Sequence, residues 1–147
     1  MIQYITHRNQ LLSIIIHHSF QKQGIEFFTP DNFSQQLAYM KRPKEYVIPP
    51  HVHNVVSREV TLTQEVLLIK SGKVRVDFYD DDKNYLESVI IAKGDVILLA
   101  GGGHGFEMLE ESEIIEVKQG PYAGEKDKVR FEPISKEDLK VKDDSSQ

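Results

Sequence analysis

The sequence predicts an all-β fold, and two observations carry this prediction. Between residues 46 and 118 the apolar residues come in short blocks, which is the pattern of many brief strands rather than of helices. Residues that favour turns separate the blocks, for example Ser71-Gly72 and Lys93-Gly94-Asp95. Many short strands at this spacing are typical of a sandwich or a barrel.

The expected strands follow one another with a turn after each block. Residues 80–84, which are rich in aspartate, are expected to form a hairpin tip. The seven strands expected in this region are residues 45–54, 60–70, 74–79, 86–91, 96–100, 105–109 and 113–118.

The first 45 residues are expected to add further strands. Residues 11–20 fit either a strand or an amphipathic helix by periodicity, and the strand is preferred. Residues 24–29 end at Pro30, and residues 33–41 end before Pro43. Both are expected as peripheral strands added to the main sheets.

The length of 147 residues suits one hydrophobic core and is short for two domains. A single domain is therefore expected over residues 1–133, with its barrel-like part at about residues 45–120. Residues 134–147 are almost wholly polar, and they are expected to be a disordered tail.

Composition excludes several classes of function. The chain has 18 Lys and Arg against 23 Asp and Glu, and a net charge of -5 does not favour nucleic acid as a partner. It has no cysteine, which excludes disulfides, thiolate nucleophiles and cysteine-based metal sites and is compatible with the cytoplasm. Its apolar stretch at residues 11–16 is too short to span a bilayer, so no membrane partner is expected.

His51 and His53 are the first candidate metal ligands. They are two apart in a stretch that reads as a strand, so both imidazoles leave the same face with their Cα atoms about 7 Å apart. Pro49 and Pro50 remove two backbone donors and place the segment at a sheet edge or strand end. Taken alone, the pair also fits two surface histidines. His17 and His18 are adjacent, point to opposite sides of a strand and are expected at the surface.

Glu65 is the candidate carboxylate ligand. Alternation places it on one strand face with Thr63, Leu67 and Ile69, and a carboxylate on an apolar face needs a cation or a proton. The opposite register, in which Glu65 faces solvent, is the alternative. Glu59 is the competing carboxylate, but it lies where a loop is expected.

His104 completes the candidate set because glycines flank it on both sides. Gly103 and Gly105 permit positive φ and a close backbone approach, which would aim the imidazole inward. Phe106 and Met108 would share its strand face and wall an apolar cavity. A glycine-rich hairpin with an exposed histidine is the alternative.

Three imidazoles and one carboxylate suit a divalent transition metal such as Fe, Mn, Ni, Co, Cu or Zn. These four ligands would leave one or two positions of an octahedral ion open to water or substrate. Such an ion acts as a Lewis acid or, if it is iron, binds dioxygen.

The motifs resemble the cupin superfamily. Its first motif has two histidines one residue apart, then a glutamate, then six residues and a glycine, as in His51, His53, Glu65 and Gly72. Its second motif is similar to residues 94–104, which begin with Gly-Asp and end at His104. Two departures are a longer gap between His53 and Glu65, and an alanine at position 100 where a proline is common.

The resemblance, which extends to small single-domain bacterial metal-binding cupins, implies a double-stranded β-helix with extra N-terminal strands and a homodimer. We therefore expect a metal-dependent enzyme that acts on a small polar metabolite, such as a sugar derivative, by isomerisation, epimerisation or oxygenation. The alternative is a metal-containing module that binds or senses a small molecule without turnover. In the expected enzyme, Tyr39, Phe106 and Met108 line the cavity near the metal, and no catalytic base is assigned.

Overall fold

The all-β fold class is confirmed by the computed structural model, which describes residues 1–142. Its two helical segments are the short 3-10 turns η1 (Gly124–Asp127) and η2 (Lys136–Asp138). No helix in this part of the chain is long and apolar enough to cross a membrane. The strands are β1 (Ile2–His7), β2 (Gln10–Ile16), β3 (Gly24–Phe27), β4 (Ala38–Lys41), β5 (Glu65–Ser71), β6 (Lys73–Tyr79), β7 (Tyr85–Ala92), β8 (Val96–Leu99), β9 (Gly103–Met108), β10 (Glu113–Lys118) and β11 (Val141–Lys142).

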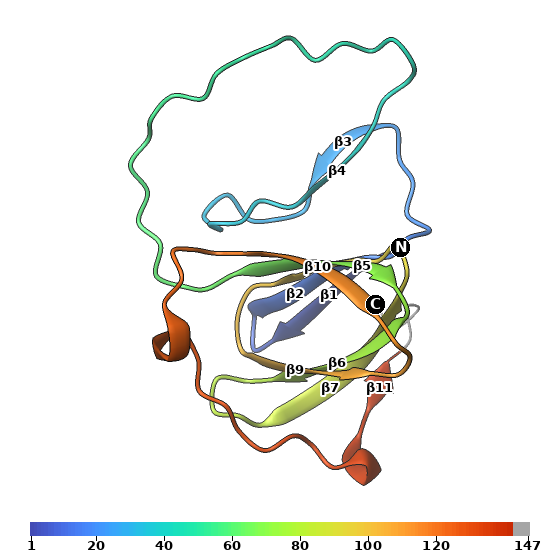
Figure 1. Ribbon diagram of the computed structural model, residues 1–147, viewed down its shortest axis with the longest axis vertical. Coiled ribbons are helices and arrows are strands. Elements are labelled where there is room, and N and C mark those ends of the chain that lie inside the picture. Colours follow the sequence, from blue (N-terminus) through green and yellow to red (C-terminus); the bar gives the residue numbers. More distant parts are fainter. Residues whose placement is uncertain (143–147) are drawn as a thin grey trace.

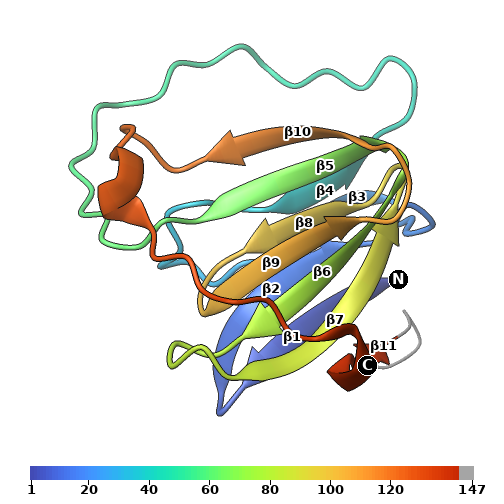
Figure 2. The same ribbon diagram turned by 60° about the horizontal axis from the view of Figure 1, so that its bottom comes forward.

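Two sheets face each other and enclose the main core (Figures 1 and 2). One sheet has the strand order β1-β2-β8-β5-β10, and the other has the order β11-β7-β6-β9. All strand pairs in them are antiparallel except β11 with β7. Strands β9 and β10 therefore each stand at an edge of a sheet.

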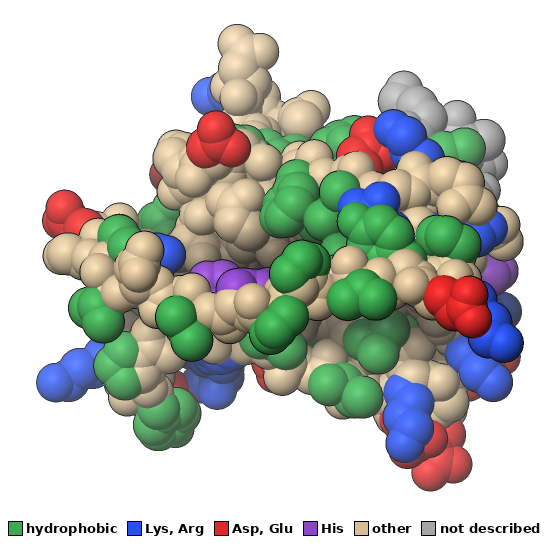
Figure 3. Space-filling model, turned by 90° about the horizontal axis from the view of Figure 1, so that it is seen from above, with side chains coloured by type: hydrophobic (Ala, Val, Ile, Leu, Met, Phe, Trp, Pro, Cys, Tyr) green, Lys and Arg blue, Asp and Glu red, His purple; other side chains and the backbone are tan. Residues whose placement is uncertain are grey.

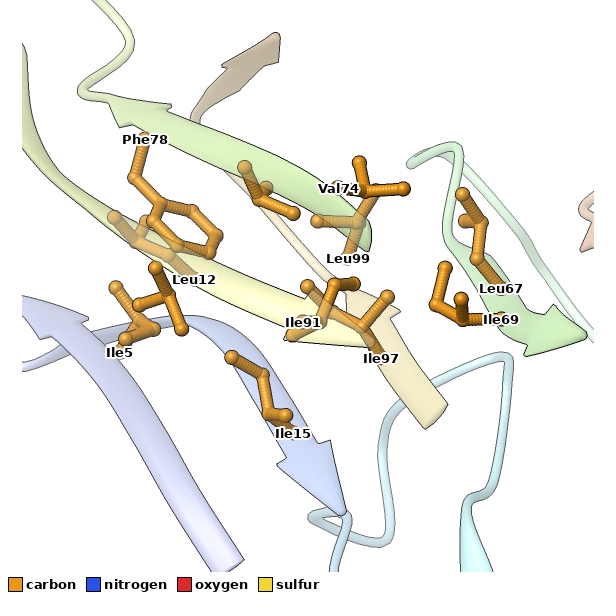
Figure 4. Packing of buried hydrophobic residues seen from close by; sticks show 12 residues of the cluster. Ile5, Leu12, Ile15, Leu67, Ile69, Val74, Phe78, Ile91, Ile97 and Leu99 are labelled. Carbon is orange, nitrogen blue, oxygen red and sulfur yellow. The ribbon is translucent and has the colours of Figure 1, made fainter. Parts of the chain in front are cut away.

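The core between these sheets is built from apolar side chains, nearly all aliphatic, that alternate along the strands (Figure 4). Ile97 and Ile15 come from the five-stranded sheet, and Val76, Phe78 and Ile91 come from the opposite sheet. Each of these five side chains is at most 1 % exposed, and burial of this apolar area is the main driving force for folding. Strands β5 and β9, which carry candidate ligands, are fixed to this core through Leu67, Ile69 and Phe106.

The strands predicted from residue 74 onward are confirmed, and β6 to β10 begin and end within two residues of the expected positions. The turn at residues 80–84 lies between β6 and β7 as expected. There the carboxylate of Asp80 accepts hydrogen bonds from the backbone amides of Asp82 and Asn84, both at 2.9 Å.

The strand predicted at residues 45–54 is wrong, and the strand predicted at residues 60–70 begins only at Glu65. Residues 42–64, which we call the arm, form one long segment that turns at residues 44–45, is otherwise without regular structure and has no strand pairing in the described chain (Figure 1). Pro43, Pro49 and Pro50 lack the backbone donors that pairing requires. The arm leaves the body after β4 and returns at β5.

The N-terminal strands differ from the expectation in their placement. Strand β1 was not expected, and it pairs with β2 through residues Ile2–His7. Strands β3 and β4 form a separate two-stranded sheet instead of extending the main sheets. This small sheet covers the outer face of the five-stranded sheet, because Leu37 and Phe28 beside it pack with Ile14 and Leu98.

The C-terminal residues also differ from the expected disordered tail. Strand β11 pairs with β7 in parallel, and the Tyr85 hydroxyl accepts a hydrogen bond from the backbone amide of Lys140 at 2.8 Å. The Tyr79 hydroxyl accepts another from the amide of Ile134 at 3.0 Å. Polar composition alone could not reveal these specific contacts. Residues 143–147, which complete the expected tail, lie outside the described residues.

Asp95 ties β8 to the segment after β2. Its carboxylate accepts hydrogen bonds from the backbone amides of His18 at 2.7 Å and Ala92 at 2.8 Å, and the His17 ring lies 3.8 Å away. The expectation that His17 lies at the surface is wrong: it is only 6 % exposed, and its Nε2 lies 2.9 Å from Gln3 Oε1. Burial by itself would raise the pKa of Asp95, but these partners outweigh it and hold the pKa below 3.8.

Stability is therefore expected to fall in acid through Asp95. Because the pKa of Asp95 is lower in the folded chain, its contribution is fully present above about pH 3.8, the unfolded value, and is lost as the pH falls through the folded pKa. Urea unfolding from pH 6 to pH 2 measures this loss. In Asp95→Asn, stability should be lower at pH 6 and should depend less on pH. An unchanged pH profile in this variant would contradict the assignment.

Candidate functional site

Glu65 is the first residue of β5, and its side chain is only 12 % exposed. Leu67 and Ile69, which alternate with it along the strand, are buried in the main core, whereas Leu68 is 37 % exposed. Glu65 thus lies on the inward strand face, as predicted, at the end of β5 where the core gives way to solvent.

His104 lies in β9 and faces the same interior from the opposite sheet. Its register partner on β6 is the buried Phe78, and its ring lies 5.5 Å from the ring of Phe106. The backbone turns sharply just before it, with φ of 68° at Gly102. A Cβ atom there would stand 2.5 Å from the carbonyl oxygen of Tyr79, so this position requires glycine. The glycines that flank His104, Gly103 and Gly105, do not have a positive φ, so the expectation of positive φ on both sides of the histidine is wrong.

Glu65 and His104 meet across the two sheets. His104 Nε2 lies 3.8 Å from Glu65 Oε2. At this distance both atoms could bind one ion without a movement of either backbone strand. The other carboxylate oxygen, Oε1, lies 3.8 Å from the Lys118 ammonium on β10. Lys118 also lies 3.3 Å from Asp127, which accepts a hydrogen bond from the Thr63 hydroxyl.

The surroundings shift the pKa values of both side chains. Burial raises the pKa of Glu65, and the neighbouring Glu116 raises it further, while Lys118 acts in the opposite direction. Burial lowers the pKa of His104, and the positive charge of Lys128 adds to this effect. The site therefore favours a neutral imidazole, which is the form that donates a lone pair to a metal.

His51 and His53 also lie together, but they lie on the arm. Their ring centroids are 5.2 Å apart, and His51 Nδ1 lies 2.9 Å from the carbonyl oxygen of Pro49. Because a carbonyl only accepts, Nδ1 carries the hydrogen, and in the neutral ring Nε2 keeps its lone pair for another partner. Both residues are exposed.

The four predicted ligands therefore fall into two pairs. Within residues 1–142, no group of three or more histidine or acidic side chains is close enough to hold a metal ion. Glu65 with His104 is one pair, and His51 with His53 is the other. One chain in this conformation therefore places two of the four predicted ligands between the sheets and the other two on the arm.

The remaining predicted site residues are spread more widely. Phe106 lies beside His104, as expected, while Met108 at the end of β9 is 48 % exposed. Tyr39 on β4 packs against Phe20, with 4.9 Å between the ring centroids. Glu59 is exposed on the arm and lines an open hollow of about 690 Å³ together with Arg58 and residues 31–36.

Sequence reasoning missed the charged residues that surround Glu65. Lys118 is the register partner of Glu65 across β5 and β10, and Glu116 is the partner of Leu67 on the same face. Asp127 is the last residue of η1 and Lys128 follows it, more than 60 positions after Glu65 in the sequence. The alternation of Glu116 and Lys118 in the last predicted strand was the signal that could have placed two of them on the inward face.

Figure 3 shows the face of the molecule that carries the arm, with hydrophobic side chains spread across it and histidine side chains beside a hollow.

Comparison with known proteins does not identify this site. The chain matches no protein-family model, no curated protein and no solved structure.

Proposed function

We propose that the protein is a cupin-type metalloprotein that binds one divalent transition metal and acts on a small polar metabolite. The observation that carries this proposal is the contact between Glu65 and His104. A largely buried carboxylate and an imidazole with a lowered pKa lie 3.8 Å apart on facing sheets. His51 and His53 would supply the other two ligands.

The two-sheet architecture supports the resemblance to cupins, and this support comes from the placement of both motifs. The stretch similar to the second cupin motif, residues 94–104, forms β8, a tight turn and the start of β9. The glutamate of the first motif begins β5, next to β8 in the same sheet. These placements bring the glutamate and the last histidine of the two motifs together.

The donor set decides which ions would fit. Imidazole nitrogen and carboxylate oxygen suit Fe, Mn, Ni, Co, Cu or Zn, and a four-ligand set leaves positions for a metabolite. A bound ion would supply Lewis-acid chemistry, or dioxygen chemistry if it were iron.

The chain's own side chains would bind and orient the metabolite. Phe106 offers an apolar ring beside His104, whereas Lys118 and Lys128 bring positive charge toward Glu65 and His104. This combination suits a polar molecule with a carboxylate, a phosphate or an oxygen that gains negative charge during reaction. Isomerisation or epimerisation of a sugar derivative and oxygenation are the reaction classes we propose to test.

One observation favours a second candidate, a metal-free site for proton transfer. The Lys118 ammonium already lies 3.8 Å from Glu65 and partly neutralises it, so a metal is not the only cation that stabilises this carboxylate. Burial and Glu116 outweigh Lys118 and raise the pKa of Glu65, which would let its carboxyl group donate a proton to a bound metabolite. Metal content separates the two candidates.

The carboxylate ligand is testable by comparing two isosteric variants. Glu65→Gln should weaken metal binding by about 100-fold or more, because it removes the anionic ligand. Glu59→Gln is the matched control, since Glu59 is an equally large acid on the exposed arm. Elemental analysis after loading with excess metal and desalting measures the effect. Metal loss in Glu59→Gln but not in Glu65→Gln would reverse the assignment.

Turnover is tested separately on the metal-loaded protein. A panel of sugar derivatives and keto acids, followed by NMR, would reveal isomerisation or epimerisation, and oxygen consumption would reveal oxygenation. Stoichiometric metal with ligand binding and no turnover on any substrate would favour a binding or sensing module instead.

A further inference from the structure

The arm exposes an unusual amount of apolar surface for a segment fixed at both ends. At its end, Gln64 is 3 % exposed and accepts hydrogen bonds from the Ser34 hydroxyl and from the Gln35 amide. Between the anchored ends, residues 42–63 are exposed throughout, and Val47, Val52 and Val55 are 73 %, 91 % and 104 % exposed. An extended segment with these side chains needs a surface to pack on.

The surface beneath the arm is apolar as well. Leu68 on β5 and Ile115 on β10 are register partners on the outer face of the five-stranded sheet, at 37 % and 51 % exposure. Phe27 on β3 and Met40 on β4 are 60 % and 46 % exposed. The same side of the molecule therefore carries both a protruding apolar segment and an apolar sheet face.

The chain also offers a place for an additional strand. Strand β9 pairs with β6 on one side, and on its other side no strand pairs with it within residues 1–142. An unpaired strand edge presents free backbone donors and acceptors, which favours addition of an extended segment. His104 lies on this edge strand.

The arm is turned away from its own β9. Figures 1 and 2 both show it arching beyond the outer side of β5 and β10, whereas β9 belongs to the sheet on the other side of the core. In this position the exposed arm is accessible to a second molecule. Each chain thus carries an unpaired extended segment and an unpaired edge, and a two-fold pair of chains would satisfy both.

We propose that the arm of one chain docks along the β9 edge of a second copy, so that His51 and His53 of one chain join Glu65 and His104 of the other. This inference rests on the proposed function only for the metal, since the docking itself follows from the arm and the free edge.

Strand addition gives the histidines the required geometry. Neighbouring strands lie about 4.8 Å apart, and residues two apart share one face. Residues 51–63 of the arm contain no proline, so they keep the backbone donors that pairing requires. An arm strand formed by them beside β9 would therefore present both imidazoles next to His104, on the face that looks toward Glu65. The 5.2 Å between the two rings shows that they already lie close enough to approach one ion.

The absence of cysteine from the sequence allows a clean cross-linking test that needs no metal. We would co-express one chain carrying His53→Cys with a differently tagged chain carrying His104→Cys and oxidise the mixture with diamide. The expected product on a non-reducing gel is a covalent dimer at twice 16.9 kDa that contains both tags. No cross-link would overturn the proposal.

Two further variants serve as controls for this cross-link. In a single chain carrying both substitutions, a disulfide within one chain, seen as a monomer with altered mobility, would overturn docking between copies. Pairing His53→Cys with Lys83→Cys controls for random collisions, because Lys83 lies in the turn between β6 and β7. Light scattering of the unmodified protein should give the mass of a dimer, and a monomer would overturn the proposal.

The shared metal site is tested by complementation, with Co²⁺ as a spectroscopic probe. A homodimer of His51→Ala/His53→Ala and a homodimer of Glu65→Gln/His104→Ala should each bind no Co²⁺ tightly. The purified heterodimer of the two variants should bind one ion, because one of its two sites has all four ligands. A cross-link between the His53→Cys and His104→Cys chains, together with no Co²⁺ binding by the wild-type protein, would leave docking supported and the proposed function refuted. A heterodimer without Co²⁺, beside wild type that binds it, would overturn the shared site.

Discussion

Replacing Asp77 by alanine is expected to lower the free energy of unfolding by about 3–5 kcal/mol, because it leaves a buried guanidinium without its main partner. Asp77 is 3 % exposed, and both of its oxygens accept hydrogen bonds from Arg75, at 2.8 and 3.1 Å. The Ser88 hydroxyl, fully buried, donates to the same carboxylate. Glu107 also accepts a hydrogen bond from Arg75 and would retain part of the interaction.

These polar groups are buried because the C-terminal segment covers the outer side of β6 and β7. The Tyr85 hydroxyl lies 2.7 Å from the Ser88 hydroxyl and also binds the backbone of Lys140. Asp77→Ala should therefore loosen residues 134–142 as well, which hydrogen exchange would detect. Urea unfolding measures the change in stability, with Asp81→Ala in the exposed turn as control. A loss below about 1 kcal/mol would show that Glu107 alone balances Arg75.

Most of the fold followed from local patterns in the sequence. Strands β6 to β10 were predictable because each has alternating or continuous apolar residues and ends at a turn residue. The arm was not, because Val52 and its neighbours have the composition of a strand while Pro49 and Pro50 remove backbone donors. The composition of a segment indicates that it is suited to a sheet, but it does not indicate whether a partner strand is available.

The candidate site was predictable in part for the same reason. Alternation placed Glu65 inward correctly, since Leu67 and Ile69 define the buried face, and the glycine run pointed to a special backbone, which lies at Gly102. Spacing could not reveal that His51 and His53 lie on the arm, where they form no group with Glu65 and His104 within residues 1–142. Their position depends on where the arm lies, which is a property of the tertiary or quaternary arrangement.

Gly102→Ala is expected to destabilise the protein by at least about 2 kcal/mol and to weaken the metal binding that we propose. Two effects combine at this position. The φ of 68° is unfavourable for any residue with a Cβ, and the added methyl group would stand 2.5 Å from the carbonyl oxygen of Tyr79. To relieve this clash, the start of β9 must move away from β6, and His104 would move with it.

Gly105→Ala is the matched control in the same strand, since its nearest heavy atom, in the Tyr79 ring, would be 4.0 Å from the new Cβ. We expect the free energy of unfolding of this variant to lie within about 0.5 kcal/mol of the wild-type value, and its proposed metal affinity to be unchanged. Thermal unfolding and Co²⁺ titration of both variants measure the two effects. Equal stability and equal metal affinity of the two variants would show that the glycine-rich turn does not position His104, because only Gly102 combines a positive φ with a backbone clash among these two positions.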